Sequence, residues 1–234
     1  MTTNHKTGLQ HKNSESISAD TAVWVFDLDN TLYPHGTDLF AQMDVKMGGF
    51  IADMFSVDRI EARRIQKDYL MRYGTTLRGL MNHHGVDPHH YLQTVHDLDL
   101  SAIKRDPALR EALQQLPGRK LVFTNADTPY AERVLDKLGV ADILDTVFDI
   151  HAADFAPKPD QTAYDMFMKK HGVDPTQAVM VEDMARNLKP AKEMGMQTVW
   201  VNTGSVWGEA DHHPDFIDVE ISDLSAWLTK LTNQ

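Results

Sequence analysis

The chain has 234 residues, of which 42% are hydrophobic and 24% are charged, and its formal net charge is −11. This composition is ordinary for a globular protein and allows one large domain or a domain with an insertion. The negative charge disfavours a nucleic-acid-binding scaffold, because such binding draws on clustered Lys and Arg, which form no block here. The absence of cysteine excludes disulfides, thiolate metal sites and cysteine nucleophiles.

The N-terminal region is polar. Residues 1–20 have almost no apolar periodicity, which predicts a flexible tail. No stretch approaches the roughly 18 apolar residues that span a bilayer, and no apolar segment typical of a secretory signal begins the chain. We therefore expect a cytoplasmic protein with no membrane partner. No feature of the sequence indicates an oligomeric state.

The first predicted strand, over residues 23–26, leads directly to two acids, Asp27 and Asp29. Its unbroken apolar run is typical of a strand covered on both faces, as in parallel sheets. Ligands of such sheets bind beyond the carboxyl ends of the strands, where both acids emerge. Carboxylates this close repel each other unless a cation such as Mg²⁺ neutralises them. This favours Asp27 as a nucleophile on phosphorus and Asp29 as acid and then base, although two acids that merely cap a loop remain an alternative.

The next segment has helical spacing. Apolar residues recur every three or four positions from Phe40 to Met54, and Asp58 with Glu61 forms the pattern of a capping box. A turn then precedes a short predicted helix over 89–95. We predict an all-helical insertion over residues 35–104 that caps a sheet domain made of residues 21–34 and 105–234.

From Asp106 onward, helices and strands alternate, which is typical of βαβ units and a parallel sheet. Helices are predicted after Asp106, Thr128 and Pro159, after the strand that ends at Asp183, and near the C-terminus. The predicted strands cover residues 120–125, 147–150, 178–183 and 197–201.

Three further polar groups fall at strand ends or in adjacent loops. Thr124 and Asn125 end one strand and offer donors for phosphate oxygens, although a polar turn at a strand end is the preferred explanation for this pair in isolation. Lys158 lies between two prolines that stiffen its backbone, so it is either a fixed cation for phosphate or a solvent-facing lysine. Glu182 and Asp183 end another strand and would complete an oxygen-rich Mg²⁺ site with Asp27. Their joint occurrence in this order favours a phosphoryl-transfer site.

The segments FDLDNTLYP, FTNA, APKPD and VMVEDMARNLKPAKEMG are similar, in order, to the four motifs of the haloacid dehalogenase superfamily. The resemblance implies an α/β fold, a doubly wound, Rossmann-like parallel sheet with a helical cap inserted after the first strand. It also implies roles for the residues. Asp27 would be nucleophile and Mg²⁺ ligand, and Asp29 would be acid/base and a metal ligand through its carbonyl. Thr124 and Asn125 would bind phosphate, Lys158 would be the bridging cation, and Asp183 would bind the metal with Glu182 as a ligand or beside one.

Within that superfamily, an acid at the position of Asp29 separates phosphotransferases from dehalogenases, so the resemblance implies a phosphatase. LYP after the first motif, YGTTLRGLM and VHDLDL are similar to the pyrimidine 5′-nucleotidases, which implies UMP or CMP as substrate. The alternatives are a phosphatase for a sugar phosphate or another small phosphoester, and a catalytically silent phosphate-binding module.

Several histidines and tryptophans lie outside these motifs. The pairs His83-His84 and His89-His90 either ligate zinc or decorate an exposed turn, and His96 has either a role near the substrate or a structural one. Trp24 and Trp200 belong to predicted strands, which places them in the core. No role is assigned to Trp207.

Overall fold

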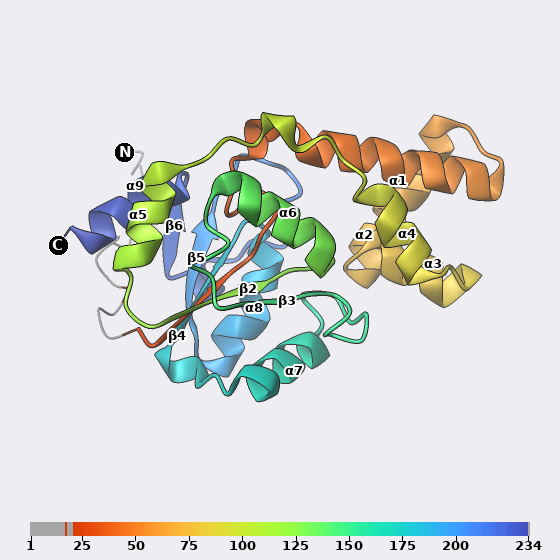
Figure 1. Cartoon of the computed structure of the whole chain (residues 1–234). Helices are drawn as coiled ribbons and strands as arrows, with labels where there is room; N and C mark the ends of the chain where they lie inside the picture. The colour runs from red at the N-terminus through yellow and green to blue at the C-terminus, as the bar shows by residue number, and fades with distance from the viewer. Residues whose placement is uncertain (1–16, 18–20, 234) are drawn as a thin grey trace, which may run out of the picture.

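The computed structural model describes residue 17 and residues 21–233, which form an α/β fold around a six-stranded parallel sheet (Figure 1). The strand order is β3-β2-β1-β4-β5-β6, and every paired neighbour is parallel. The strands are β1 (Val23–Phe26), β2 (Arg119–Phe123), β3 (Thr146–Phe148), β4 (Ala178–Glu182), β5 (Gln197–Val201) and β6 (Val219–Ile221).

Strand β1 is central, and Phe26 at its end pairs with Val122 of β2 and with Val181 of β4. The carboxyl ends of these three strands therefore lie at one edge of the sheet. The sequence pattern correctly placed β1 to β5 but missed β6. This strand has only three residues and sits at the sheet edge, so it carries too little periodicity to be recognised.

Helices cover both faces of the sheet, which confirms the doubly wound fold. In β1, Trp24 and Phe26 belong to one hydrophobic cluster, which contains residues of α5 (Pro107–Gln115), α6 (Thr128–Leu138) and α9 (Leu224–Thr232). Val23 and Val25 belong to the cluster of the opposite face, with α7 (Gln161–His171) and α8 (Ala185–Met194). Successive strand side chains point to opposite faces, so an unbroken apolar strand supplies both cores.

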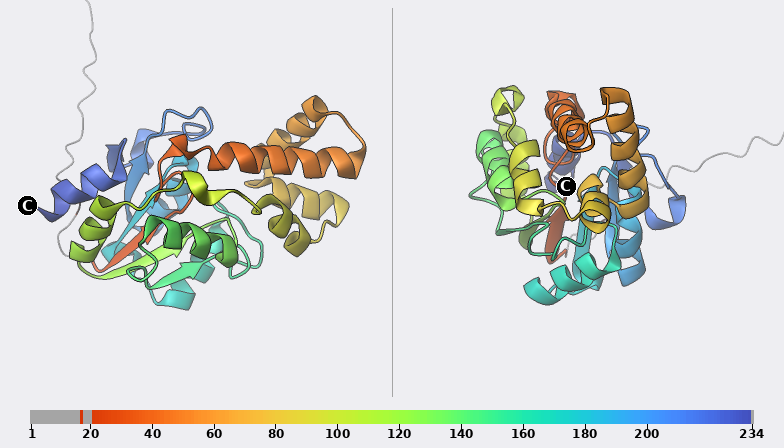
Figure 2. Two further views of the ribbon diagram at one scale, coloured as in Figure 1. Left: turned by 45° about the horizontal axis from the view of Figure 1, so that its top comes forward. Right: turned by 90° about the vertical axis from the view of Figure 1, so that its right-hand side faces the viewer.

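The remaining helices are α1 (Leu39–Phe55), α2 (Arg59–Tyr73), α3 (Thr76–His84) and α4 (Pro88–Val95), and they form a separate group beside the sheet domain (Figures 1 and 2). One hydrogen bond of the predicted capping box is confirmed: the Asp58 side chain accepts from the backbone N–H of Glu61. The division of the chain into domains at residues 35 and 104 stays a prediction. We refer to helices α1 to α4 as the cap helices.

Most of the predicted tail, residues 1–16 and 18–20, lies outside the described residues. Ile17, in contrast, is only 7% exposed and belongs to the hydrophobic cluster that contains Trp24. Among the described residues, none of the helices combines the length and the apolar character needed to cross a membrane.

Candidate active site

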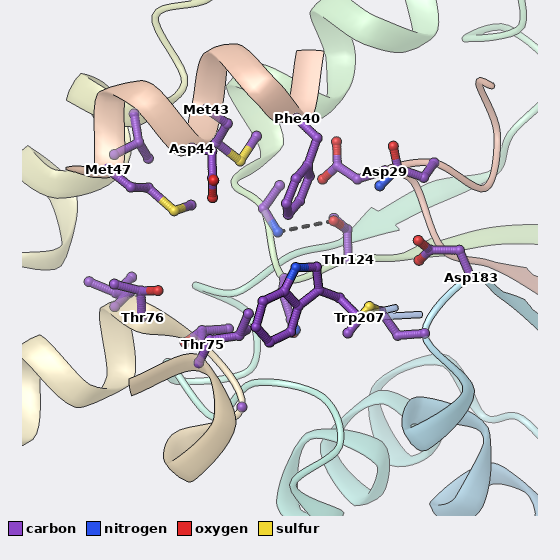
Figure 3. Close-up of a pocket in the computed structure, with 18 of the residues that line it drawn as sticks. Asp29, Phe40, Met43, Asp44, Met47, Thr75, Thr76, Thr124, Asp183 and Trp207 are labelled. Atoms are coloured by element: carbon purple, nitrogen blue, oxygen red, sulfur yellow. Dashed lines mark hydrogen bonds between the residues drawn. The ribbon is translucent and has the colours of Figure 1, made fainter. Parts of the chain in front are cut away.

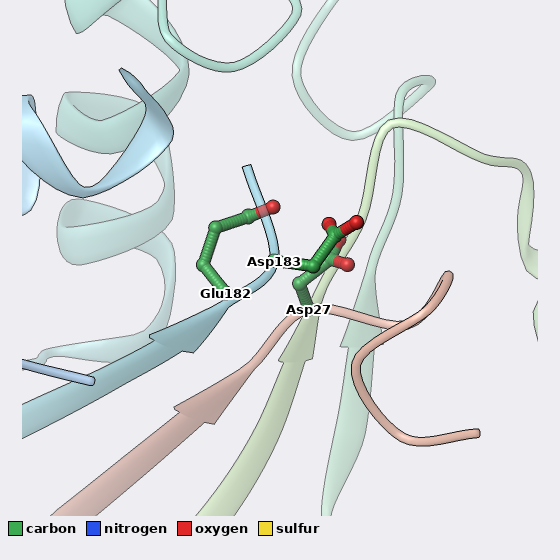
Figure 4. A group of neighbouring side chains, drawn as sticks. All are labelled: Asp27, Glu182 and Asp183. Carbon is green, nitrogen blue, oxygen red and sulfur yellow. The ribbon is translucent and has the colours of Figure 1, made fainter. Parts of the chain in front are cut away.

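The predicted site residues meet at the carboxyl edge of the sheet. Asp27 follows β1, Thr124 follows β2, and Asp183 follows Glu182 at the end of β4. Carboxylate oxygens of Asp27, Glu182 and Asp183 all lie within 4.8 Å of one another, and all three residues are buried (Figure 4). The parallel register of three adjacent strands thus brings together groups that are far apart in the sequence.

Lys158 completes this cluster from a loop. Its Nζ donates hydrogen bonds to Asp27 Oδ1 over 2.7 Å, to Glu182 Oε2 over 2.6 Å and to the carbonyl oxygen of Phe123 over 2.8 Å. The residue is 1% exposed, so the alternative of a solvent-facing lysine is wrong. All three donor positions of the ammonium group are used, which fixes it between the two carboxylates.

Asn125 secures the loop that carries Lys158. Its Oδ1 accepts a hydrogen bond from the Lys158 backbone N–H over 2.8 Å, and its Nδ2 donates to the Lys158 carbonyl oxygen over 3.2 Å. The side-chain amide is thereby committed to positioning the lysine. Thr124 is buried, and its Oγ1 accepts from the Ala126 N–H over 3.0 Å, so its own hydroxyl hydrogen is available to a bound anion.

The electrostatics of the cluster follow from burial and like charge. Burial, and then the charge of Glu182, raise the pKa of Asp27 to about 7 against the opposing effect of Lys158. Burial and the charges of Glu182 and Asp27 likewise raise the pKa of Asp183 well above its ordinary value. Burial alone would lower the pKa of Lys158, but the charges of Asp27 and Glu182 outweigh it and raise that pKa.

Asp29 lies beside this cluster and is held by two tyrosines. Tyr33 and Tyr130 both donate their hydroxyl hydrogen bonds to Asp29 Oδ1, over 2.6 and 2.8 Å. Neither tyrosine was identified from the sequence. Tyr33 lies within LYP at the end of the segment FDLDNTLYP, and Tyr130 lies on α6, where its apolar spacing indicates only a core position.

A cavity of about 420 Å³ lies between the sheet edge and the cap helices, and it is lined by Asp27, Asp29, Thr124, Lys158 and Asp183. Figure 3 shows Asp29, Thr124 and Asp183 among its lining residues. Its other walls are largely apolar and aromatic. They include Phe40, Met43 and Met47 of α1, Thr75 and Thr76 at the start of α3, and Trp207 from the loop after β5. In Figure 3 the Phe40 ring extends from α1 at the top of the view, and the Trp207 ring lies below it.

A polar group of the cap helices also faces this cavity. Asp44 Oδ1 accepts hydrogen bonds from Gln66 Nε2 over 2.6 Å and from Lys67 Nζ over 2.7 Å. Lys67 Nζ also lies 5.2 Å from the centre of the Trp207 ring, so a cation–π contact links the cap helices to the sheet domain. Sequence reasoning missed Trp207 because a loop has no periodicity that marks an inward side chain.

Comparison with known proteins identifies the family of this chain. A family model described as haloacid dehalogenase-like hydrolase matches residues 22–195. The chain belongs to this family. Asp27, Asp29, Thr124, Asn125, Lys158, Glu182 and Asp183 all fall inside the matched segment.

Relatives of this haloacid dehalogenase-like hydrolase include phosphatases. It is 30% identical to Phosphate metabolism protein 8 of Saccharomyces cerevisiae over 190 residues, which are 74% of this chain and 59% of that protein. It is 30% identical to a phosphoglycolate phosphatase of Vibrio vulnificus over 141 residues, which are 57% of this chain and 59% of that protein. The chain thus spans about three fifths of the length of these curated relatives.

Solved structures share the fold. A HAD phosphatase from Thermococcus onnurineus has a TM-score of 0.58 at 21% identity, covering 90% of this chain and 97% of that one. The L-2-haloacid dehalogenase from Xanthobacter autotrophicus has a TM-score of 0.53 at 17% identity, covering 90% and 96%. One fold thus carries a phosphatase and a dehalogenase, so the chemistry has to be argued from the site.

The residues of this hydrolase fit a hard divalent cation. The donors are all oxygen atoms, and the carboxylates of Asp27, Glu182 and Asp183 exceed the single ammonium group of Lys158 by two charges. Both oxygens of Glu182 are already engaged, one by Lys158 and one by the Met184 N–H over 3.1 Å, whereas Lys158 engages only one oxygen of Asp27. Asn187 lines the same cavity, and its buried Oδ1 has no hydrogen-bond partner.

The histidines outside the motifs have structural surroundings. His96 is buried and its Nδ1 lies 2.8 Å from Asp127 Oδ1, which agrees with a structural histidine at the edge of the cavity. His83, His84, His89 and His90 are exposed, which agrees with the interpretation that the two pairs decorate an exposed turn. Among the described residues, the only cluster able to hold a metal ion is that of Asp27, Glu182 and Asp183.

Proposed function

We propose that this protein is a Mg²⁺-dependent phosphomonoesterase that forms an aspartyl-phosphate on Asp27 and hydrolyses a pyrimidine nucleoside 5′-monophosphate such as UMP or CMP. The observation that carries the chemistry is the buried Lys158 ammonium group between Asp27 and Glu182. It counters the charge of an attacking carboxylate and of an arriving phosphate at the floor of a cavity.

The reaction has two displacements. In the first, an Asp27 oxygen attacks phosphorus, the bond from phosphorus to the ester oxygen breaks, and Asp29 gives its proton to the departing alcohol. In the second, Asp29 takes a proton from water, the water oxygen attacks phosphorus, and the bond to Asp27 breaks to release inorganic phosphate. Lys158 and the Thr124 hydroxyl orient the phosphoryl oxygens throughout.

Mg²⁺ would be held by the carboxylates of Asp27 and Asp183 and by the Asp29 carbonyl, and it would neutralise charge on the phosphoryl oxygens. Glu182, whose oxygens are occupied, holds Lys158 in place beside these ligands. Asn187 Oδ1 offers a hydrogen-bond acceptor to a water at the same end of the cavity.

The leaving group occupies the rest of the cavity. Phe40 and Trp207 provide flat apolar faces for a nucleobase, and Gln66 and Asp44 provide polar groups at the cap helices. The similarity of LYP, YGTTLRGLM and VHDLDL to the pyrimidine 5′-nucleotidases narrows the base to a pyrimidine.

A second candidate is a phosphatase for a small phosphoester such as phosphoglycolate, which the names of the relatives from Vibrio vulnificus favour. The same catalytic residues would act, and the cap helices would close over a smaller leaving group. A catalytically silent phosphate-binding module is disfavoured because Asp27, Asp29 and Lys158 are all present and assembled.

Phosphate release from UMP, CMP, AMP, ribose 5-phosphate and phosphoglycolate, each measured with Mg²⁺ and with EDTA, tests this proposal. We expect the highest kcat/KM for UMP or CMP, no turnover in EDTA, and no turnover by Asp27→Asn. Asp53→Asn is the matched control, because it makes the same chemical change at an exposed aspartate of α1. A preference for ribose 5-phosphate or phosphoglycolate would remove the nucleotidase assignment, and full activity of Asp27→Asn would remove the mechanism.

A further inference from the structure

Asp29 receives both of its side-chain hydrogen bonds on one oxygen. Tyr33 and Tyr130 donate to Oδ1, and their own hydroxyl oxygens lie 3.4 Å apart. Among the described residues, no group donates to Asp29 Oδ2. Tyr33 lies four positions after Asp29 in the chain, whereas Tyr130 lies 101 positions away on α6, so two unrelated segments converge on the same atom.

We infer that Tyr33 and Tyr130 are positioning residues that hold the Asp29 carboxyl group in one orientation, with Oδ2 as the oxygen that gives and takes the proton. This inference rests on the proposed phosphatase function, in which Asp29 is the acid and then the base. The resemblance to the four motifs assigns no role to either tyrosine.

The hydrogen bonds on Oδ1 indicate which Asp29 oxygen carries the proton. A carboxylate oxygen offers two lone-pair sites in the carboxyl plane, and two O–H donors fill both of them on Oδ1. A proton on Oδ1 would compete with these donors, and turning the protonated carboxyl group over would bring its O–H against both of them. The proton therefore belongs on Oδ2. When it leaves, the hydroxyl groups already point at the carboxylate on which negative charge develops.

The surroundings keep the two phenol rings in place. Tyr33 is 1% exposed and Tyr130 is 0% exposed. The Tyr130 ring stacks on the His96 imidazole, with ring centres 4.6 Å apart and an interplanar angle of 16°. His96 is in turn bonded to Asp127, which also accepts the Tyr130 backbone N–H over 3.2 Å.

These neighbours also connect Asp29 to the cap helices. Tyr33 lies between β1 and α1, where the chain enters the cap helices, and His96 directly follows α4, where the chain leaves them. The orientation of the proposed acid is thus set at the two crossings between the sheet domain and the cap helices. A misplaced acid slows proton transfer even when the substrate is bound normally.

The inference predicts a dependence on the leaving group. When the bond from phosphorus to the ester oxygen breaks, that oxygen of an alkyl ester needs the proton from Asp29 Oδ2. The oxygen of p-nitrophenyl phosphate leaves as a stabilised phenolate and needs it far less. The ratio kcat/KM reports the steps through this first bond cleavage, so a loss of acid positioning lowers it for UMP much more than for the aryl ester.

The experiment compares kcat/KM for UMP and p-nitrophenyl phosphate, with Mg²⁺, in wild-type protein, Tyr33→Phe, Tyr130→Phe and the double variant. General acid catalysis contributes about 10²- to 10⁴-fold, so we expect each single change to lower kcat/KM for UMP by about tenfold or more. For p-nitrophenyl phosphate we expect a loss of less than about threefold, with KM nearly unchanged for both esters. Tyr69→Phe is the control, because it removes a hydroxyl bonded to His84 Nε2 over 2.7 Å outside the cavity, and both rates should stay at wild-type values.

Equal losses for the two esters, or no loss for either, would overturn the inference and leave the proposed function standing. Either single variant is sufficient to decide if the other does not fold, as judged by circular dichroism. A wild-type protein that hydrolyses neither ester in Mg²⁺ would overturn the proposed function, and the inference with it.

Discussion

Lys158 Nζ lies 2.7 Å from Asp27 Oδ1, although 131 residues separate the two positions. Both side chains are buried, and the same ammonium group also contacts Glu182. A buried ion pair of this kind is costly to break from one side, because the remaining carboxylates lose the cation that is hydrogen-bonded to them. The cluster is therefore a feature of the folded state as much as of the proposed chemistry.

Replacing Lys158 should destabilise the protein. We expect Lys158→Ala to lower the free energy of unfolding by about 3–5 kcal/mol, because it leaves Asp27 and Glu182 buried without a cation. Urea denaturation measures this change. Lys189→Ala is the control. That lysine forms an exposed pair with Glu193, and its loss should change the free energy of unfolding by less than about 0.5 kcal/mol. Equal effects of the two substitutions would contradict the burial argument.

The effect of Mg²⁺ on stability should increase with pH. The pKa of Asp27 is raised from 3.8 to about 7 by burial and by Glu182, so the folded metal-free protein retains a proton that the unfolded chain loses. This group's contribution to the stability of the metal-free protein therefore falls as pH rises between these two values. Bound Mg²⁺ requires the ionised carboxylate, so its affinity is weakened below about pH 7.

Thermal denaturation with and without Mg²⁺ on the two sides of neutral pH measures this linkage. We expect the increase in Tm caused by Mg²⁺ to be larger in mildly alkaline than in mildly acidic buffer. In Asp27→Asn the same increase should be small at both pH values, because one of the two carboxylate ligands is lost. A shift in wild-type protein that is largest at acid pH would contradict the assignment of Asp27 as the titrating ligand.

Trp207 should contribute to the choice of leaving group. We expect Trp207→Ala to raise KM for UMP, because stacking of a base on an aromatic side chain is worth about 1–3 kcal/mol, which corresponds to roughly 5- to 150-fold. KM for phosphoglycolate, which has no ring, should change by less than about threefold. Val206→Ala is the control, since this neighbouring side chain is 74% exposed and does not line the cavity. Similar changes in KM for both esters would exclude a role in recognising the base.

Replacing either of two glycines of the cap helices by alanine should change the free energy of unfolding, but in opposite directions. At Gly79 in α3, an added Cβ would lie 2.4 Å from Tyr69 Cγ, so we expect Gly79→Ala to cost about 1–3 kcal/mol of stability. At Gly49 in α1, a Cβ meets nothing within 4 Å, and Gly49→Ala should add about 0.5–1 kcal/mol through helix propensity. Urea denaturation of the two variants measures both changes in stability. A stabilising Gly79→Ala would contradict the close approach of Tyr69 to Gly79.

Much of the fold follows from local patterns. The apolar run at residues 23–26, the helical spacing from Phe40, and the alternation after Asp106 predicted the parallel sheet and the inserted helices. Strand β6 was missed because three residues carry no usable period. Ile17 was assigned to a tail because an isolated apolar residue in a polar segment gives no sign of the surface that it covers.

The sequence by itself determined which chemistry is available, because acids at strand ends and a lysine between prolines can be recognised from short segments. Only the tertiary structure decided how these groups are arranged. In the folded chain Lys158 is buried between two carboxylates, Trp207 lines the cavity, and the Tyr130 hydroxyl donates a hydrogen bond to Asp29. These contacts join segments far apart in the chain, and their geometry depends on strand order and loop paths that no local periodicity encodes.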